Sequence, residues 1–266
     1  MTTPAGTLAR IAARKEAEAA TLRCAAATLW AKAESLPPAR DISVLRGGAV
    51  IAELKRRSPS GGALREGLDS AATAAAFAAA GAAALSVLTD APDFGGSLDD
   101  LDRVRAAVDI PLLRKDFVVD PVQVAEARIG GADWVLLIAA LLDDDQLAEC
   151  LEATERSGAA AIVEAHDEDE VRRAVSAGAA CIGINNRDLT TLVTDVATFA
   201  RLRPLVPDTV LCVAESGMRD AAAVATVVSE GADAVLVGEA LMRSESPEAL
   251  CAEMVRVARS AARGAS

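Results

Sequence analysis

The chain has 266 residues, a formal net charge of −12, and 52% apolar residues against 2% aromatic ones. This negative charge disfavours nucleic acids and anionic membranes as partners, because both are bound through basic patches. The length suffices for one large domain with a buried core, and no exposed apolar stripe is obvious, so we expect a monomer or a weak homodimer.

The first predicted element is helical. Residues 7–35 are charged and rich in alanine, and the pair Pro37–Pro38 that follows them favours the end of a helix. We expect residues 1–48 to form a helical cap on a body formed by residues 49–260. The whole chain, 1–266, is therefore predicted to be a single domain.

A diverged repeat runs through the rest of the chain. In each copy a helical segment ends in glycine, alanine follows, and a short apolar run comes next. The copies begin at Gly81, Gly131, Gly158, Gly178 and Gly231. Glycine suits the left-handed residue that ends a helix, and continuous apolar runs suit parallel strands covered by helices. Three further runs, 49–55, 111–117 and 209–216, complete eight predicted strands.

Amphipathic, charged segments separate these strands. Eight strand–helix units in a row predict the α/β class and a closed parallel barrel, the (β/α)8 or TIM barrel, with an N-terminal helical extension. An open doubly wound sheet is the alternative, but no Gly-x-Gly-x-x-Gly follows the first strand. Barrel enzymes place their sites where the strands end, so the polar residues there are the candidates.

The first and third strands both end in lysine. Glu53 and Lys55 are two residues apart, so they face the same side of the sheet and can pair at the barrel mouth. The alternative is a surface ion pair at a solvated strand end. Lys115 lies in an apolar run and is costly to bury, so we expect it to face the mouth as an acid or anion binder. A structural salt bridge with Asp116 is the alternative.

The fifth and sixth strands end in groups that suit proton transfer. Glu164 follows an apolar run and is a candidate general acid or base. His166 shares its side of the strand, but a single histidine at a strand end is more often structural than catalytic. Asn185 and Arg187 share a face after the sixth strand and offer donors to hydroxyls and to developing negative charge.

The seventh and eighth strands end in glycine-containing turns. These are Ala-Glu-Ser-Gly at 214–217 and Val-Gly-Glu at 237–239. Glycine lets backbone N–H groups approach an anion, and a phosphate site after these two strands is frequent in such barrels. Ordinary tight turns are the alternative use of the same glycines.

Cysteine and histidine usage disfavours metal chemistry. The five cysteines form no Cys-x-x-Cys pair, and the chain has one histidine, so we expect no metal site. No basic segment followed by an apolar core opens the sequence, so no signal peptide is predicted. A cytoplasmic location with reduced thiols is therefore expected.

These strand ends together resemble the indole-3-glycerol phosphate synthase family. The resemblance covers roughly residues 50–243, with a weaker likeness in the N-terminal helix. Seven strings carry it, in the order of the family, at residues 51–60, 86–90 with 94–97, 113–117, 163–164, 183–189, 214–217 and 237–243. Two departures are Val122 after Pro121, where the family often has an aromatic residue, and Met218 after Gly217, where isoleucine is commoner. Neither removes a catalytic group.

The resemblance implies a carbon–carbon lyase of the carboxy-lyase type in tryptophan biosynthesis. Its partner would be a small phosphorylated substrate, 1-(2-carboxyphenylamino)-1-deoxyribulose 5-phosphate. Ring closure onto the sugar carbonyl, decarboxylation and dehydration would give indole-3-glycerol phosphate, CO2 and water. The resemblance implies no cofactor.

The resemblance also implies roles for particular residues. Lys115 would be the general acid at the carbonyl oxygen, Lys55 would hold the substrate carboxylate, and Glu164 would act in dehydration as acid or base. Which lysine serves which proton transfer stays open. The other implied catalytic residues are Glu53, Asn185 and Arg187. The implied substrate-binding residues are Ser58, Gly217, Gly238 and Glu239 around the phosphate, Glu215 and Ser216 along the wall, and Phe94 over the anthranilate ring.

Two other functions compete with this one. Phosphoribosylanthranilate isomerase is a similar phosphate-binding barrel, but it uses a cysteine on the first strand, and no cysteine lies there in this chain. A repurposed paralogue could keep the barrel without the activity. The presence of Lys55, Lys115 and Glu164 argues against that alternative.

Overall fold

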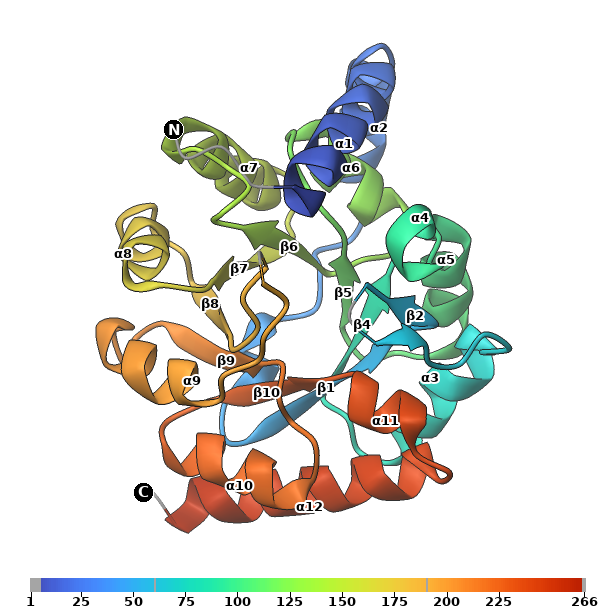
Figure 1. The fold of residues 1–266 in the computed structure, drawn as a ribbon. Helices are drawn as coiled ribbons and strands as arrows, with labels where there is room; N and C mark the ends of the chain where they lie inside the picture. The colour runs from blue at the N-terminus through green and yellow to red at the C-terminus, as the bar shows by residue number, and fades with distance from the viewer. Residues whose placement is uncertain (1–5, 60, 190, 265–266) are drawn as a thin grey trace.

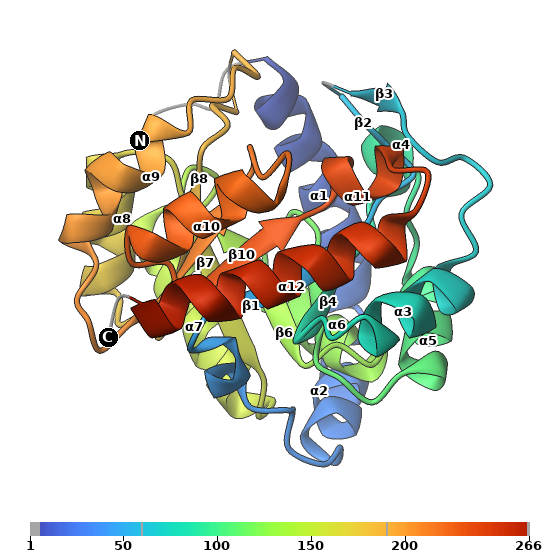
Figure 2. The ribbon, with the colours of Figure 1, turned by 90° about the horizontal axis from the view of Figure 1, so that it is seen from below.

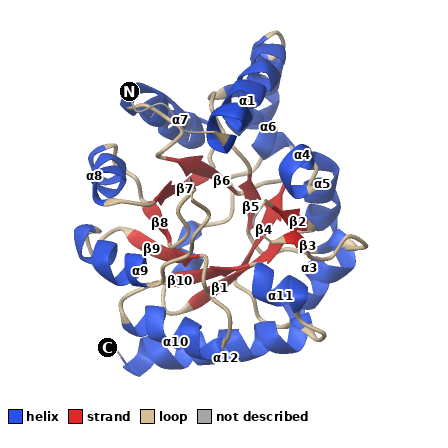
Figure 3. Cartoon of the chain, viewed as in Figure 1, coloured by secondary structure: helices blue, strands red, loops and turns tan. Residues whose placement is uncertain are grey.

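The computed structural model describes residues 6–59, 61–189 and 191–264. In these residues eight parallel strands close into a barrel with helices outside it, which confirms the predicted (β/α)8 barrel (Figures 1 and 3). Around the barrel the strands are β1 Ala49–Leu54, β10 Ala234–Val237, β9 Leu211–Glu215, β8 Cys181–Asn185, β7 Ala160–Ala165, β6 Trp134–Ile138, β5 Leu112–Lys115 and β4 Ala84–Leu88.

Helices follow the strands and form the outer layer. They are α3 Ser70–Ala79, α4 Ala91–Phe94, α5 Leu98–Ala107, α6 Val122–Ile129, α7 Asp144–Arg156, α8 Glu168–Ser176, α9 Ala197–Leu202, α10 Ala221–Ser229, α11 Glu239–Arg243 and α12 Pro247–Gly264, with short 3-10 helices at Ile42–Leu45 and Arg203–Leu205. Asp69, Asp143 and Asp167 show why several of them begin where they do, because each side chain accepts a hydrogen bond from a backbone N–H of the first turn. No helix in the described ranges is both long and apolar enough to cross a membrane.

The N-terminal segment forms two helices, α1 Thr7–Arg23 and α2 Ala26–Glu34, where the sequence predicted one over 7–35. Ala25 leaves the helical conformation, with φ −112° and ψ 11°. No proline or glycine marks this break, because its cause is tertiary. α1 reaches the end of β5 through Lys15, whereas α2 packs against α6 and buries Trp30.

A small hairpin follows β1 and was not predicted. Its strands, β2 Arg57–Ser58 and β3 Gly62–Ala63, pair antiparallel beside α4 (Figure 2). Arg57 fixes this position by donating from Nη2 to the backbone oxygens of Ala91 and Pro92, at 2.9 and 2.8 Å. Two-residue strands are too short to show the alternation from which strands are recognised in a sequence.

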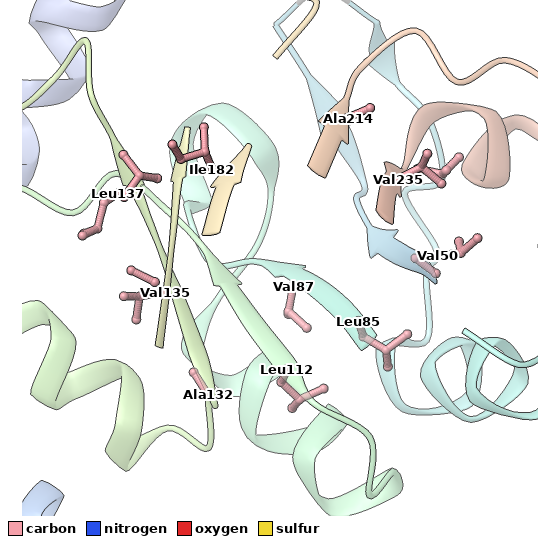
Figure 4. Packing of buried hydrophobic residues seen from close by; sticks show 14 of the residues in the cluster. Val50, Leu85, Val87, Leu112, Ala132, Val135, Leu137, Ile182, Ala214 and Val235 are labelled. Carbon is pink, nitrogen blue, oxygen red and sulfur yellow. The ribbon is translucent and has the colours of Figure 1, made fainter. Parts of the chain in front are cut away.

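Alternation along the strands separates two apolar layers. Val50 and Leu54 face outward, where they pack against the helices, and Figure 4 shows part of that layer around Leu112 and Val135. Ile51 faces the barrel interior. Because side chains alternate across a strand, Glu53 continues the inward row toward the C-terminal end. The packing that buries the strands therefore also fixes which side chains reach the mouth.

Candidate active site

A cavity of about 650 Å³ opens at the C-terminal ends of the barrel strands. Its floor is apolar, formed by inward residues such as Leu136 and Leu236, and its walls are polar. The predicted site residues that line it are Glu53, Lys55, Phe94, Lys115, Glu164, Asn185, Arg187, Glu215, Ser216, Gly217, Gly238 and Glu239. Residues far apart in the sequence therefore meet in one cavity.

Two lysines and three buried carboxyl groups form the polar centre of the cavity. Lys55 Nζ lies 2.6 Å from Glu53 Oε1. Lys115 Nζ lies 2.8 Å from Glu164 Oε2 and 3.5 Å from Glu215 Oε2. Each ammonium is thus held against a carboxylate but stays on the wall of the cavity, where a ligand can replace or share the contact.

The charges at this centre reinforce one another. Burial by itself would lower the pKa of Lys115, but the surrounding carboxyl groups, Glu164 foremost, raise it above the usual 10.5. Burial would raise the pKa of Glu164, yet Lys115 and His166 hold it well below the usual 4.5. At neutral pH the site therefore presents an ammonium that can give a proton and a carboxylate that can take one.

Glu164 is also fixed in direction by neutral and cationic neighbours. Asn185 Nδ2 donates to Glu164 Oε1 at 3.0 Å. His166 Nε2 lies 3.2 Å from the same oxygen, and its Nδ1 lies 2.9 Å from Glu170 Oε2. Burial would lower the pKa of His166, but the two carboxylates raise it to about 10, so the ring is an imidazolium at neutral pH. His166 therefore orients the Glu164 carboxylate from a position outside the cavity lining.

Asp116 follows Lys115 directly and also lines the cavity, but its carboxylate pairs with other cations. Lys15 Nζ on α1 lies 2.7 Å from its Oδ1, and Arg114 Nη2 lies 3.0 Å from its Oδ2. Burial would raise the pKa of Asp116, but these two cations hold it well below its usual value. The structural salt bridge between Lys115 and Asp116 is therefore not formed, because both groups have other neighbours.

Two glycines leave space for carboxyl groups. A Cβ on Gly238 would lie 2.4 Å from Glu53 Oε1, and a Cβ on Gly183 would lie 2.2 Å from Glu215 Oε1. Neither distance is compatible with a side chain at these positions. Glycine is needed here because a carboxyl group occupies the place of its missing side chain.

Guanidinium groups gather at the end of the cavity near β9 and β10. Glu239 Oε1 lies 3.0 Å from Arg243 Nε, and its Oε2 lies 3.4 Å from Arg187 Nη2. Ser216 has φ 62° and Gly217 has φ 84°. Positive φ at a serine costs of order 1 kcal/mol and is typical of binding sites. Two arginines beside a backbone turn suit an anionic group such as phosphate.

An aromatic wall faces these charges. Phe94, in α4, and Phe117, after β5, have ring centroids 6.0 Å apart at an angle of 42°. Both rings line the cavity. The two rings offer apolar faces against which an aromatic ligand can pack.

Comparisons with known proteins agree with this geometry. The sequence model of the indole-3-glycerol phosphate synthase family matches residues 7–254. An indole-3-glycerol phosphate synthase from Parafrankia sp. (strain EAN1pec) is 54% identical over 232 residues, which cover 86% of this chain and 87% of that protein. Those from Mycobacteroides abscessus and Nocardioides sp. are 50% and 54% identical, over 86% and 79% of this chain and 85% and 81% of their own. The chain belongs to the indole-3-glycerol phosphate synthase family.

In this member of the indole-3-glycerol phosphate synthase family, one predicted site residue lies beside the cavity rather than on its wall. Among the described residues, Ser58 is the predicted site residue that does not line the cavity. It is buried in β2, and its hydroxyl accepts a hydrogen bond from the backbone N–H of Gly61 at 2.9 Å. Ser60, which the family string includes, lies outside the described residues. The structure thus ties Ser58 to the hairpin.

Sequence reasoning missed several residues of this family member's site. Phe117 and Arg243 line the cavity, and both fall inside strings that carried the resemblance, so those strings held the signal. Gly183 lies in another such string, but only coordinates show which carboxyl group needs its space. Lys15 gives no signal, because nothing in the sequence places α1 beside Asp116.

Proposed function

We propose that this chain converts 1-(2-carboxyphenylamino)-1-deoxyribulose 5-phosphate to indole-3-glycerol phosphate, CO2 and water. The observation that carries the proposal is the meeting of Lys55, Lys115 and Glu164 in one cavity of about 650 Å³. Membership of the indole-3-glycerol phosphate synthase family supports it. The chain is on this basis a carboxy-lyase that also closes a ring.

The cavity suits a substrate with an anion at each end. We assign the substrate carboxylate to Lys55, whose ammonium is held at the wall by Glu53. We assign the phosphate to the turn at 216–217 and the backbone at 238–239, beside the guanidinium of Arg187. The phenyl ring then lies against Phe94. These contacts would bind an anionic molecule locally, against the net charge of −12.

We assign the first chemical step to Lys115. The ring carbon that bears the carboxylate attacks the sugar carbonyl, and the carbonyl oxygen gains negative charge as the bond forms. The raised pKa of Lys115 keeps its ammonium charged until then. An alkoxide is a much stronger base than an amine, so the ammonium can still give it a proton. CO2 then leaves, and its bonding electrons restore the aromatic ring.

We assign the base of the dehydration step to Glu164. Its lowered pKa keeps it ionised, and Asn185 fixes the direction of its carboxylate. It removes a proton from the carbon next to the one that loses its hydroxyl, and the double bond of the indole forms. We assign Arg187, which lines the cavity, to holding the sugar hydroxyls and the phosphate rather than to proton transfer.

The test is to supply the substrate to the purified chain and follow indole absorbance and fluorescence, with and without a metal chelator. We expect turnover in both conditions, because every assigned step uses a side chain of this protein. Absence of indole formation by a folded sample would refute the proposal. Loss of turnover in chelator would refute the assignment of the steps.

We further propose that the chain acts as a single domain, 1–266, in the cytoplasm, as a monomer or a weak homodimer. The buried cysteines support a reducing compartment, since Cys150, Cys181, Cys212 and Cys251 are all free thiols. Sedimentation at two protein concentrations tests the oligomeric state. A tight dimer over the whole concentration range would contradict it.

A further inference from the structure

Glu215 occupies an unusual position among the buried carboxyl groups. Its residue is 2% exposed, and its Oε1 lies over Gly183, where it fills the space of the missing side chain. Gly183 is the residue that pairs with Glu164 between β7 and β8. The β9 carboxyl group therefore reaches across β8 and lies beside the carboxylate of Glu164.

The hydrogen bonding of Glu215 is incomplete. In the described part of the chain, its Oε1 is buried and has no donor. Its Oε2 faces Lys115 Nζ at 3.5 Å, but that ammonium makes its shorter contact with Glu164. A buried oxygen that accepts no hydrogen bond is costly, unless it carries a proton and donates one instead.

The balance of charges around the cavity also indicates that one carboxyl group holds a proton. The nearby cations make their shortest contacts with other carboxylates: Lys55 with Glu53 at 2.6 Å, Lys115 with Glu164 at 2.8 Å and His166 with Glu170 at 2.9 Å. Glu215 is then one carboxyl group more than these cations balance. Two carboxylates in contact cannot both stay ionised in a buried site, so one of them holds a proton.

Of the two carboxyl groups, Glu215 holds the proton and Glu164 is ionised. Burial and the neighbouring carboxylates of Glu164 and Glu53 raise the pKa of Glu215 to about 8, although Lys115 acts against them. The pKa of Glu164, in contrast, lies well below its usual value of 4.5. Two carboxyl groups whose environments push their pKa values apart are a known arrangement for an acid and a base. The groups that bear on Glu215 are Glu53 on β1, Lys115 on β5, Glu164 on β7 and Cys181 on β8, and His166 acts on its neighbour Glu164.

We infer that Glu215 is a neutral carboxylic acid in the resting site and that it gives the proton with which the substrate hydroxyl leaves as water. In this step the C–O bond breaks and the oxygen takes the bonding pair and the Glu215 proton. The C–H bond on the neighbouring carbon breaks, its electrons form the double bond, and its proton goes to Glu164. That proton then passes to Glu215 across their contact, which restores both groups. The inference rests on the proposed function, because it assigns a step of that reaction.

The test is Glu215→Gln in a single-turnover experiment that follows CO2 and indole separately. Glutamine keeps the size and neutrality of a carboxylic acid and can donate a hydrogen bond to Glu164, but it has no proton to give. We expect CO2 release near the wild-type rate and indole formation slower by about 10²- to 10⁴-fold, as for loss of a general acid. Glu253→Gln, on the exposed face of α12, is the matched control and should behave as wild type.

Two results would overturn the inference. Indole formation by Glu215→Gln at the wild-type rate would show that Glu215 only donates a hydrogen bond. Equal slowing of CO2 and indole would show that it acts before dehydration. If the wild-type chain releases neither product, the proposed function fails instead.

A second measurement does not depend on the folding of a variant. The carboxylic-acid carbonyl stretch in the infrared spectrum of the wild-type chain should be present at neutral pH and vanish with a midpoint near pH 8. Absence of that band from the folded chain at neutral pH would also overturn the inference.

Discussion

The two ends of the barrel bury charged side chains in different ways. At the N-terminal end, both carboxylate oxygens of Asp133 have donors: Oδ1 accepts from the backbone N–H of Arg40 at 2.9 Å, and Oδ2 accepts from the backbone N–H of Leu112 and from Arg105 Nη1, both at 3.0 Å. At the C-terminal end, Glu215 Oε1 has no donor and Lys115 lies between the carboxyl groups of Glu164 and Glu215. Saturated charges hold a structure together, whereas unsaturated ones are available to a substrate.

The largest effect that this comparison predicts is on catalysis. Lys115→Ala should reduce kcat by about 10²-fold or more, because the carbonyl oxygen loses its proton donor. The rate of indole fluorescence increase under saturating substrate measures it. Turnover close to that of wild type would remove Lys115 from the role assigned here.

At the N-terminal end of the barrel, removal of a buried charge should lower stability rather than activity. Asp133→Asn removes the charge that Arg105 and Arg40 share, and it places an amide where two acceptors are needed. We expect a loss of about 3 kcal/mol in the free energy of unfolding, since one member of a buried ionic network is removed. Denaturant unfolding measures this, and kcat at a permissive temperature should stay unchanged. A stable variant with low kcat would break the comparison.

A smaller effect on activity should come from steric overlap with a positioning group rather than from loss of a charge. Gly238→Ala places a methyl group 2.4 Å from Glu53 Oε1, so the carboxylate must move away from Lys55. We expect kcat/KM to fall by about 10- to 100-fold, as small displacements of positioning groups do. Gly67→Ala is the matched control, because no atom lies within 4 Å of its added Cβ. Equal activity of the two variants would contradict the spatial argument.

A further effect should appear in the pH dependence of stability. The pKa of Glu215 is raised from 4.5 to about 8 in the folded state, so the folded chain binds more protons than the unfolded chain between these values. The free energy of unfolding therefore falls as pH rises through this window, by at most about 1.4 kcal/mol per pH unit from this group. Glu215→Gln should remove this group's part of the slope, which denaturant unfolding at several pH values measures, whereas the part from His166, whose pKa is raised to about 10, stays. An unchanged slope would mean that Glu215 is ionised throughout.

The sequence was sufficient where local rules decide the outcome. Alternation along a strand placed Glu53 and Lys55 together on the cavity wall, and it placed His166 on the same side of its strand as Glu164, although His166 itself does not line the cavity. Glycine after each helix marked five of the strands correctly. These inferences depend only on the local conformation of the chain next to each residue.

The rest depended on contacts between distant segments. The break at Ala25 has no local cause, and Lys15 meets Asp116 only because α1 lies at the end of β5. Gly183 is explained by Glu215, which comes from a different strand. A sequence pattern read along one strand cannot show which side chain of the next strand fills a gap.

The central claim is that residues from separate strands surround one small anionic molecule. A structure of the chain with a substrate analogue whose carbonyl is reduced to an alcohol, so that the ring cannot close, tests this most directly. We predict the analogue carboxylate at Lys55, its phosphate at the turn 216–217, and its alcohol oxygen within hydrogen-bonding distance of Lys115 Nζ. An analogue bound outside the cavity, or bound in it without contact to Lys115, would contradict the account.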